Sequence, residues 1–196
     1  MDTNDIVHAV EAVRKGKLIV YPTDTLYALG ANVSQKKAIT AIFQLKQRPK
    51  SLPLPVAVSD KHMLSKVAIL SPLAKKLAHT FFPGKITLVC RKKQDIPSIV
   101  TAGKDTIAVR IPDDQIALTL LKKTGPLVAT SANIHKMKPA ATVSEIRKLF
   151  KPEIVEVYID DGIRQGKPST IVDVTESQPV ILREGSISKK MILELE

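Results

Sequence analysis

The sequence has few of the residues on which several classes of protein depend. It holds one cysteine, Cys90, and no tryptophan, with three tyrosines and four phenylalanines. A single cysteine excludes an intramolecular disulfide framework and is typical of the reducing cytoplasm. Cys90 ends the apolar run ITLVC, so we expect a buried and unreactive thiol. The shortage of aromatic rings leaves little material for stacking platforms that bind single-stranded nucleic acid.

Long apolar runs and the common catalytic motifs are also missing. No segment approaches the roughly 18 consecutive apolar residues of a membrane span, and the acidic amino terminus is unlike a secretory signal. There is no Walker phosphate loop, no GxGxxG fingerprint and no GxSxG elbow. The histidines lack metal-ligand spacing, so we expect no metal site made of protein side chains. An enzyme with this sequence would therefore work by positioning and charge stabilisation rather than by covalent catalysis.

Acidic residues are outnumbered by basic ones. The chain has 19 Asp and Glu against 30 Lys and Arg, which gives a net charge of +11. Such a charge favours polyanionic partners such as nucleotides, pyrophosphate or RNA. The lysines occur in scattered pairs, such as Lys36–Lys37 and Lys122–Lys123, rather than in one block. A basic but solvated surface explains the charge equally well, so RNA binding stays open at this point.

The hydrophobic pattern predicts helices that alternate with strands, followed by strands bunched near the end. Helices are expected around Ile6–Val13, from a Ser34 cap to Gln47, from Pro72 to about Pro83, over Asp114–Lys123 and from a Thr142 cap to about Phe150. Strands are expected over 18–21, 54–58, 86–91, 106–111, 126–130, 154–159, 170–174 and 180–183. Pro53 and Pro55 should confine the second strand to an edge or a short piece. The pattern predicts one domain with a mixed sheet and helices packed on it.

The segment KLIVYPTDTLYALG, from Lys17 to Gly30, organises the rest of the chain. Its apolar run reads as a buried strand that Pro22 ends, because proline cannot donate to the ladder. Thr23, Asp24, Thr25 and Tyr27 then follow at the carboxyl end of the strand, where ligands sit in open α/β sheets. We expect Gly30 to turn the backbone with positive φ before the next helix. A polar loop that caps only itself is the alternative for this segment taken alone.

Polar residues recur beside several other apolar strands. Arg110 stands inside IAVRIP, where a charge needs a carboxylate or another anion as partner. The others are Lys46 and Arg48 after the second helix, Thr130, Ser131 and Asn133 after PLVA, Ser169 and Thr170 before IVDV, and Arg183 after VIL. Solvent exposure or a local hydrogen bond explains any one of them. Together they predict one cavity, with hydroxyls and amides for a small polar ligand and cations for phosphates.

Seven segments of the chain resemble the YrdC-type threonylcarbamoyl-adenylate synthase family. They are YPTDTLYALGA, LKQRPKSLPLPVAV, FFPGKITLV, TIAVRIP, PLVATSAN, KPSTIVDV and ILREGSIS, and they follow the order of the family from about Ile6 to Ser188. The resemblance implies a YrdC/RibB-like fold, a twisted open mixed (mostly parallel) α/β sheet flanked by helices around a concave basic cavity. It also implies a compact member in which residues 1–196 form a single domain.

The resemblance implies a defined reaction. L-threonine and bicarbonate (or CO2) form a carbamate, which attacks the α-phosphate of ATP and releases pyrophosphate and threonylcarbamoyl-AMP. Mg²⁺ is expected to arrive with the nucleotide, since metal ions usually bridge its phosphates. A partner complex then transfers the threonylcarbamoyl group to a tRNA adenosine beside the anticodon. The family therefore implies tRNA and that complex as partners, a cytoplasmic location and no membrane.

The family's functional positions map onto residues of this chain by motif. The L-threonine-binding set is Thr25, Arg110, Ser131 and Ser169. The ATP-binding set is Arg48, the backbone at Leu52, Thr106, Asn133, Thr142 and Arg183, with Lys46 and Arg48 as the catalytic pair. Arg110 suits the amino-acid carboxylate, because its planar fork pairs with two oxygens at once. Thr142 has a second explanation, a capping box with Glu145.

Three positions depart from the family pattern and leave other functions open. Ala28 replaces a glycine, Ala57 replaces a common histidine, and the turn at His135–Met137 is apparently one residue longer. One alternative is an RNA-binding or regulatory module that kept the fold and lost the reaction. Another is the related carbamoyl-transfer module of hydrogenase maturation proteins, which the single cysteine disfavours because that module accompanies zinc-finger segments.

Overall fold

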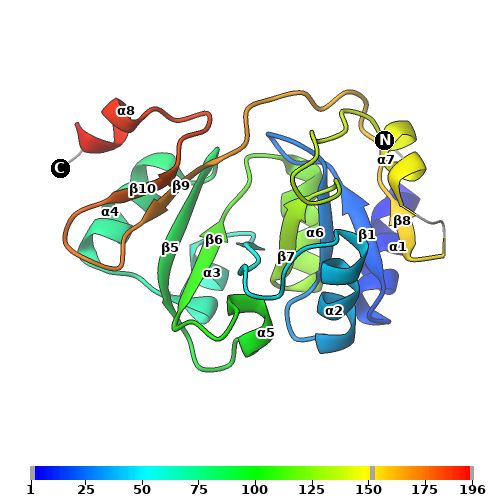
Figure 1. The fold of residues 1–196 in the computed structure, drawn as a ribbon, viewed down its shortest axis with the longest axis horizontal. Helices are drawn as coiled ribbons and strands as arrows, with labels where there is room; N and C mark the ends of the chain where they lie inside the picture. The colour runs from blue at the N-terminus through cyan, green and yellow to red at the C-terminus, as the bar shows by residue number, and fades with distance from the viewer. Residues whose placement is uncertain (1–2, 151–152, 195–196) are drawn as a thin grey trace.

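The structure, a computed structural model, describes residues 3–150 and 153–194 and is built around one ten-stranded sheet (Figure 1). The strands run in the order β10-β9-β5-β6-β3-β7-β2-β1-β8, and β4 pairs with β5 beside this path. The strands are β1 (Leu18–Tyr21), β2 (Ala28–Asn32), β3 (Val56–Ala57), β4 (Ala68–Ile69), β5 (Ile86–Lys92), β6 (Thr106–Arg110), β7 (Leu127–Ser131), β8 (Val155–Tyr158), β9 (Thr170–Asp173) and β10 (Val180–Arg183). The helices are α1 (Thr3–Arg14), α2 (Lys36–Leu45), α3 (Lys61–Val67), α4 (Pro72–Phe81), α5 (Ser98–Thr101), α6 (Gln115–Thr124), α7 (Val143–Leu149) and α8 (Lys189–Leu193).

The expected mixed open sheet with helices on it is confirmed, but its strands are not mostly parallel. Only β1–β8, β3–β6 and β5–β9 are parallel pairs among the described strands. The remaining pairs are antiparallel. Short connections such as the one between β9 and β10 allow only antiparallel pairing, because a parallel pair needs a long crossover.

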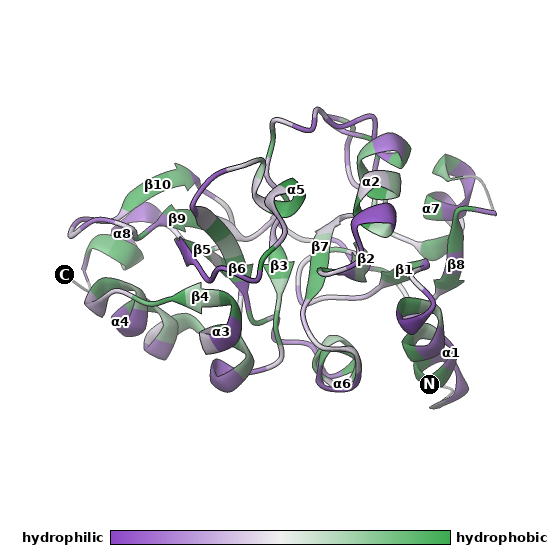
Figure 2. Cartoon of the chain, turned by 90° about the horizontal axis from the view of Figure 1, so that it is seen from below, coloured by the Kyte–Doolittle hydropathy of each residue, from purple (hydrophilic) through white to green (hydrophobic). Residues whose placement is uncertain are grey.

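Two hydrophobic clusters fill the space between the sheet and its helices. One contains Ile39, Ile42 and Phe43 of α2 together with residues of α3 to α5 and α7. The other joins α1 and α6 to the sheet through residues such as Val13 and Leu120. In Figure 2, hydrophilic residues gather on the outer sides of α1 and α4, while hydrophobic residues dominate the strands between the helices. Helix amphipathicity therefore sets which side of each helix faces the sheet.

Residues 28–32 form β2, a strand that the sequence did not indicate. It pairs antiparallel with both β1 and β7. The expected positive-φ turn at Gly30 is therefore wrong, because Gly30 lies within this strand. A Cβ built on Gly30 would stand 2.7 Å from Cε1 of Tyr21, so glycine leaves room for the Tyr21 ring. Close packing, rather than backbone freedom, accounts for this glycine.

The second helix differs from expectation at both ends. Its N-cap is Gln35, which makes no side-chain cap, so the predicted Ser34 cap is wrong. The turn that precedes the helix is instead closed by Asn32, whose Oδ1 accepts a hydrogen bond from the Ser34 amide at 2.8 Å. The helix ends at Leu45, before the predicted Gln47, which has a φ of 51°. The chain thus turns two residues ahead of Pro49.

Strand β3 is short, as its prolines predict, but it is not at an edge. Val56 and Ala57 pair with β6 on one side and with β7 on the other. These neighbours are longer, with five residues each. The sheet is therefore interrupted at its centre, just where the chain arrives from Pro55.

Candidate functional site

A cavity of about 280 Å³ lies at this central interruption of the sheet. Its lining combines six serine and threonine side chains with three arginines, and no acidic residue or histidine contributes among the described residues. The serines and threonines are Thr23, Thr25, Thr87, Thr130, Ser131 and Ser169, and the arginines are Arg48, Arg110 and Arg183. The remaining lining residues are Leu26, Tyr27, Ala28, Pro55, Val56, Ala57, Pro112, Ala129, Pro139, Pro168 and Ile171.

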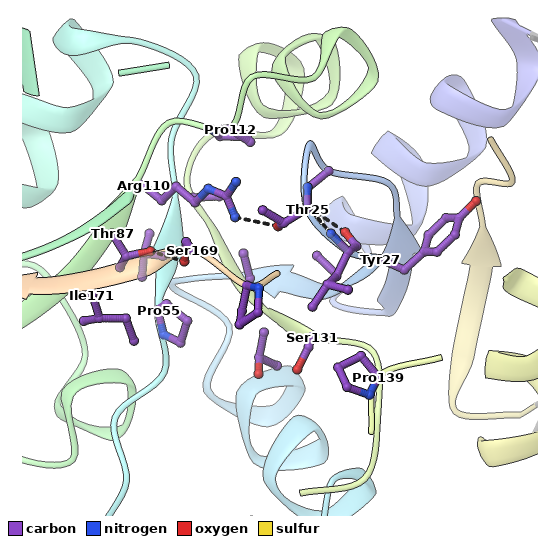
Figure 3. A pocket seen from close by; sticks show the side chains of 18 of the residues that line it. Thr25, Tyr27, Pro55, Thr87, Arg110, Pro112, Ser131, Pro139, Ser169 and Ile171 are labelled. Carbon is purple, nitrogen blue, oxygen red and sulfur yellow. Dashed lines mark hydrogen bonds between the residues drawn. The ribbon is translucent and has the colours of Figure 1, made fainter. Parts of the chain in front are cut away.

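Arg110 and Thr25 meet at one end of this cavity (Figure 3). Arg110 Nη1 donates to Thr25 Oγ1 at 2.9 Å, and Arg110 Nε donates to the Gly84 carbonyl at 3.1 Å. Its Nη2 forms an ion pair with Asp24, whose side chain is 7% exposed. A charged residue in an apolar strand needs a partner of opposite charge. For Arg110 that partner is the carboxylate of Asp24, in the loop after β1. Sequence reasoning placed Asp24 in that loop without assigning it this role.

The loop after β1 is held in shape by its own hydroxyl groups. Thr23 Oγ1 donates to the Leu26 carbonyl at 2.6 Å and accepts from the Leu26 amide at 3.2 Å. It also lies 3.1 Å from Thr25 Oγ1. Because side-chain oxygens close the turn, Thr23, Thr25 and Tyr27 all reach the cavity wall.

Ser169 is fixed by two partners on neighbouring strands. Its Oγ lies 2.8 Å from Thr87 Oγ1 of β5, as Figure 3 shows. Arg183 of β10 donates through Nη2 to the Ser169 carbonyl at 2.8 Å. Burial, and then the Arg110 charge, lower the pKa of Arg183. Thr87 was missed by sequence reasoning, although a hydroxyl inside the apolar run ITLVC was a signal for it.

Lys46 is buried behind the cavity wall rather than exposed in it. The residue is 2% exposed, and its Nζ donates to the carbonyls of Ser131 at 2.5 Å and Asn133 at 2.6 Å. A third bond reaches Asn133 Oδ1 at 3.3 Å. Ser131 Oγ donates to the same Oδ1 at 2.6 Å. Unlike Lys46 and Asn133, Ser131 lines the cavity. Burial, and then the charge of Arg48, lower the pKa of Lys46 to about 7.

Arg48 follows α2 and lines the cavity. Its Nη2 donates to the Pro53 carbonyl at 2.9 Å, and its Nε donates to the Leu52 carbonyl at 3.4 Å. These bonds fold the side chain back onto the segment that leads into β3. Burial lowers the pKa of the guanidinium. One of these two carbonyls belongs to Leu52, whose backbone the resemblance assigns to ATP.

Eleven residues carry a predicted site role, and the structure divides them into two groups. Six line the cavity: Thr25, Arg48, Arg110, Ser131, Ser169 and Arg183. Five do not: Lys46, Leu52, Thr106, Asn133 and Thr142. Thr106 begins β6 while Arg110 ends it, and strand alternation puts both on one face. Thr142 caps α7 in a complete capping box with Glu145.

The three departures from the family pattern each have a defined place. Ala28 lies in β2, paired with Tyr21 and Ser131, so no positive φ strains the alanine. Ala57 lines the cavity. The altered turn after Asn133 contacts the backbone of Lys46, because the His135 amide donates to the Lys46 carbonyl at 2.8 Å. Asn133 Nδ2 donates to the Met137 carbonyl at 2.5 Å.

Other expectations can be compared with the described part of the chain. Cys90 is buried, as expected, and burial raises its pKa to about 12. Residues 3–150 and 153–194 contain no group of three or more His, Cys, Asp or Glu placed to hold a metal ion. Within the same ranges no helix has the length and apolar character needed to cross a membrane.

Comparisons with known proteins place this geometry in context. A model of the Sua5/YciO/YrdC family, described as "Telomere recombination", matches residues 11–185. A threonylcarbamoyl-AMP synthase of Pyrococcus abyssi is 39% identical over 178 residues, which cover 89% of this chain and 52% of that protein. The chain therefore spans about half the length of this relative.

Two solved structures resemble the chain over nearly its whole length. The crystal structure of P. abyssi Sua5 complexed with L-threonine gives a TM-score of 0.91 at 36% identity, covering 97% of this chain and 56% of that one. Escherichia coli YciO gives a TM-score of 0.89 at 32% identity, covering 96% of this chain and 93% of that one. At these TM-scores both structures share the overall fold described above.

Proposed function

The chain belongs to the Sua5/YciO/YrdC family, and from this premise we propose that it is an L-threonylcarbamoyladenylate synthase, a nucleotidyltransferase. The reaction joins L-threonine, bicarbonate (or CO2) and ATP into threonylcarbamoyl-AMP and releases pyrophosphate. Support comes from the P. abyssi relative named for this activity and from the related Sua5 structure that holds L-threonine. The product would serve the threonylcarbamoyladenosine modification of tRNA beside the anticodon.

One observation carries the proposal: residues from both predicted binding sets line a single cavity. Thr25, Arg110, Ser131 and Ser169 come from the amino-acid set, and Arg48 and Arg183 come from the nucleotide set. A carbamate decomposes quickly in water, so it has to form beside the nucleotide in a sheltered site. A cavity that holds both substrates satisfies this requirement.

The chemistry asks the protein for alignment and positive charge. The threonine amine bonds to the carbon of CO2 and loses a proton, and a carbamate oxygen then attacks the α-phosphorus. The bond from that phosphorus to the bridging oxygen breaks, and pyrophosphate leaves with the electron pair. Arg48 and Arg183 are suited to the negative charge on the phosphates, because a guanidinium pairs with two oxygens. Mg²⁺ supplies further charge neutralisation when it arrives with the nucleotide.

Arg110 is suited to the carboxylate of the amino acid. It already pairs with Asp24 and Thr25, which fix the plane of its guanidinium. A preorganised donor loses little entropy when the ligand binds. The buried Lys46 would act indirectly in this scheme, by holding Ser131 and Asn133 in place.

The test is pyrophosphate release from ATP by the purified chain, with each reactant omitted in turn. We expect release only when L-threonine and bicarbonate are both present. Release that persists without L-threonine, or no release from a folded protein, would contradict the proposal. The omission series matters because a contaminating enzyme that hydrolyses ATP to AMP and pyrophosphate would not depend on either reactant.

A second candidate function is an RNA-binding or regulatory module without the reaction. The net charge of +11 favours it, and so do the departures from the family pattern at Ala28, Ala57 and His135–Met137. The slope of tRNA affinity against salt concentration tests this candidate, because each phosphate contact adds to the slope. A flat slope would leave the lysines as ordinary surface residues.

A further inference from the structure

The segment from Asp160 to Pro168, here called the strap, joins β8 to β9 without regular secondary structure. Figure 1 shows it passing over the top of the sheet from β8 on the right to β9 on the left. Every residue from Asp160 to Lys167 is exposed except Arg164, whose side chain is 24% exposed. A connection with so little buried surface needs specific anchors to keep one position.

Arg164 ties the strap to three other parts of the chain. Its Nη2 lies 3.1 Å from Oδ2 of Asp114, the buried N-cap of α6, and also pairs with Asp161 of the strap itself. Its Nη1 donates to the Thr23 carbonyl at 3.3 Å. Its backbone amide donates to the Ala141 carbonyl at 2.8 Å. One side chain therefore joins the strap to α6 and to the loop after β1.

The strap lies directly against the amino-acid end of the cavity. A Cβ built on Gly166 would stand 3.1 Å from the Thr25 carbonyl oxygen, so the two backbones are nearly in contact. Tyr27 Oη accepts from the Asp161 amide at 2.9 Å and donates to the Gly162 carbonyl at 2.8 Å. Pro168, at the end of the strap, lines the cavity beside Ser169. The strap and the loop after β1 thus form adjoining walls.

We propose that Arg164 is a positioning residue, a latch that holds the strap against the loop after β1 and so fixes Thr25 and Ser169 around the bound amino acid. Arg164 does not line the cavity, so it acts through these walls rather than on the substrate. The choice of L-threonine as the ligand rests on the proposed function. The latch itself rests on the contacts of Arg164 alone. Arg48, on the nucleotide side, is held by the Leu52 and Pro53 carbonyls and is independent of the latch.

The test compares Arg164→Met and Arg164→Lys with Lys167→Met in the full chain. Lys167 is a matched control, because it is an exposed cation of the same strap whose side chain has no hydrogen bond or ion pair within the described residues. Amide hydrogen exchange of the peptide 160–168 is measured first. We expect about tenfold faster exchange in Arg164→Met, the scale of one lost charged hydrogen bond. Lys167→Met should exchange like the wild type, and Arg164→Lys should fall between.

Steady-state kinetics add a readout that general destabilisation does not give. In Arg164→Met the KM for L-threonine should rise about 10- to 100-fold. The KM for ATP should change much less, because Arg48 is held independently of the strap. Equal exchange in Arg164→Met and Lys167→Met would overturn the latch, and so would equal changes in both KM values. If even the wild type releases no pyrophosphate, the proposed function fails, while the exchange comparison still decides the latch.

Discussion

At the scale of single residues, the cavity separates side chains that can touch a substrate from those that hold them. Arg48 faces the cavity, whereas Lys46, two residues earlier, is buried against Ser131 and Asn133. The motif treats both as one catalytic pair, and sequence spacing gave no means of telling them apart. Helix α2 ends at Leu45, just before both residues, and Gln47 between them has a φ of 51°. The backbone therefore turns between Lys46 and Arg48, and the two side chains lie in different surroundings.

Replacing Arg48 with methionine should weaken the handling of ATP. The change removes a charge-assisted contact with the phosphates, on the order of 1.5–3 kcal/mol. We expect a rise of roughly ten- to a hundredfold in the KM for ATP, measured by pyrophosphate release. Arg14→Met is the matched control, because Arg14 ends α1 in an exposed position outside the cavity. Equal KM values for ATP in the two variants would show that Arg48 does not contribute to nucleotide binding.

Lys46 should make stability depend on pH. Its pKa is lowered to about 7 in the folded chain, so between that value and the ordinary pKa of about 10.4 the unfolded chain binds more protons. The free energy of unfolding should therefore rise with pH across this window, by at most about 1.4 kcal/mol per pH unit. This contribution is complete above the ordinary pKa and is lost as the pH falls through about 7.

Urea denaturation of the wild type and Lys46→Met across this window measures the effect. The variant loses the hydrogen bonds of Lys46 at every pH, so the informative quantity is the difference between the two free energies. That difference should widen as the pH rises. A constant difference would mean that Lys46 keeps its ordinary pKa.

At the scale of elements, strand β2 is where sequence reasoning failed most clearly. Its residues ALGAN have weak strand propensity, and the glycine suggested a turn. Pairing with β1 and β7 on both sides overrides that propensity, and neither partner can be identified from the segment itself. The strands with strong β-branched runs, such as β1 and β6, were predicted within one residue at each end. Short elements such as α5, with four residues, were not predicted because so little pattern supports them.

Gly30→Ala tests the packing explanation for β2. The new Cβ would press on the Tyr21 ring, because it would stand 2.7 Å from Cε1 of that ring. Overpacking of this kind costs about 1–3 kcal/mol, which a urea melt would detect. In the double variant Gly30→Ala/Tyr21→Leu, the smaller side chain should recover part of that loss. Additive effects of the two changes would contradict the contact.

Thr142→Ala distinguishes a helix cap from a nucleotide contact. Thr142 Oγ1 accepts from the Glu145 amide at 3.2 Å, and the Glu145 carboxylate accepts from the Thr142 amide at 3.3 Å. Loss of the cap should cost about 1 kcal/mol of stability, with no change in the KM for ATP. A rise in that KM without loss of stability would instead favour the nucleotide contact that the family resemblance implies.

At the scale of the whole molecule, the cavity depends on contacts between segments far apart in the chain. Its lining includes Thr25 from the loop after β1, Arg110 from β6, Ser169 from the segment that precedes β9, and Arg183 from β10. Motif order allowed these residues to be named together, because a family pattern already encodes the fold. Thr87 lies within the segment FFPGKITLV but received no role, and Arg164 lies outside all seven family segments. Only tertiary contacts give these two residues their partners. The interruption at β3, which opens the cavity, also depends on neighbours that no local pattern identifies.

The proposed function requires one cavity to hold the amino acid and the nucleotide side by side. The decisive test is mass spectrometry of the products formed from L-threonine, ATP and ¹³C-bicarbonate. We expect threonylcarbamoyl-AMP carrying a single labelled carbon, formed only when all three reactants are present and greatly reduced in Arg110→Met. Formation of AMP and pyrophosphate without any threonine adduct, by a folded and homogeneous protein, would contradict it.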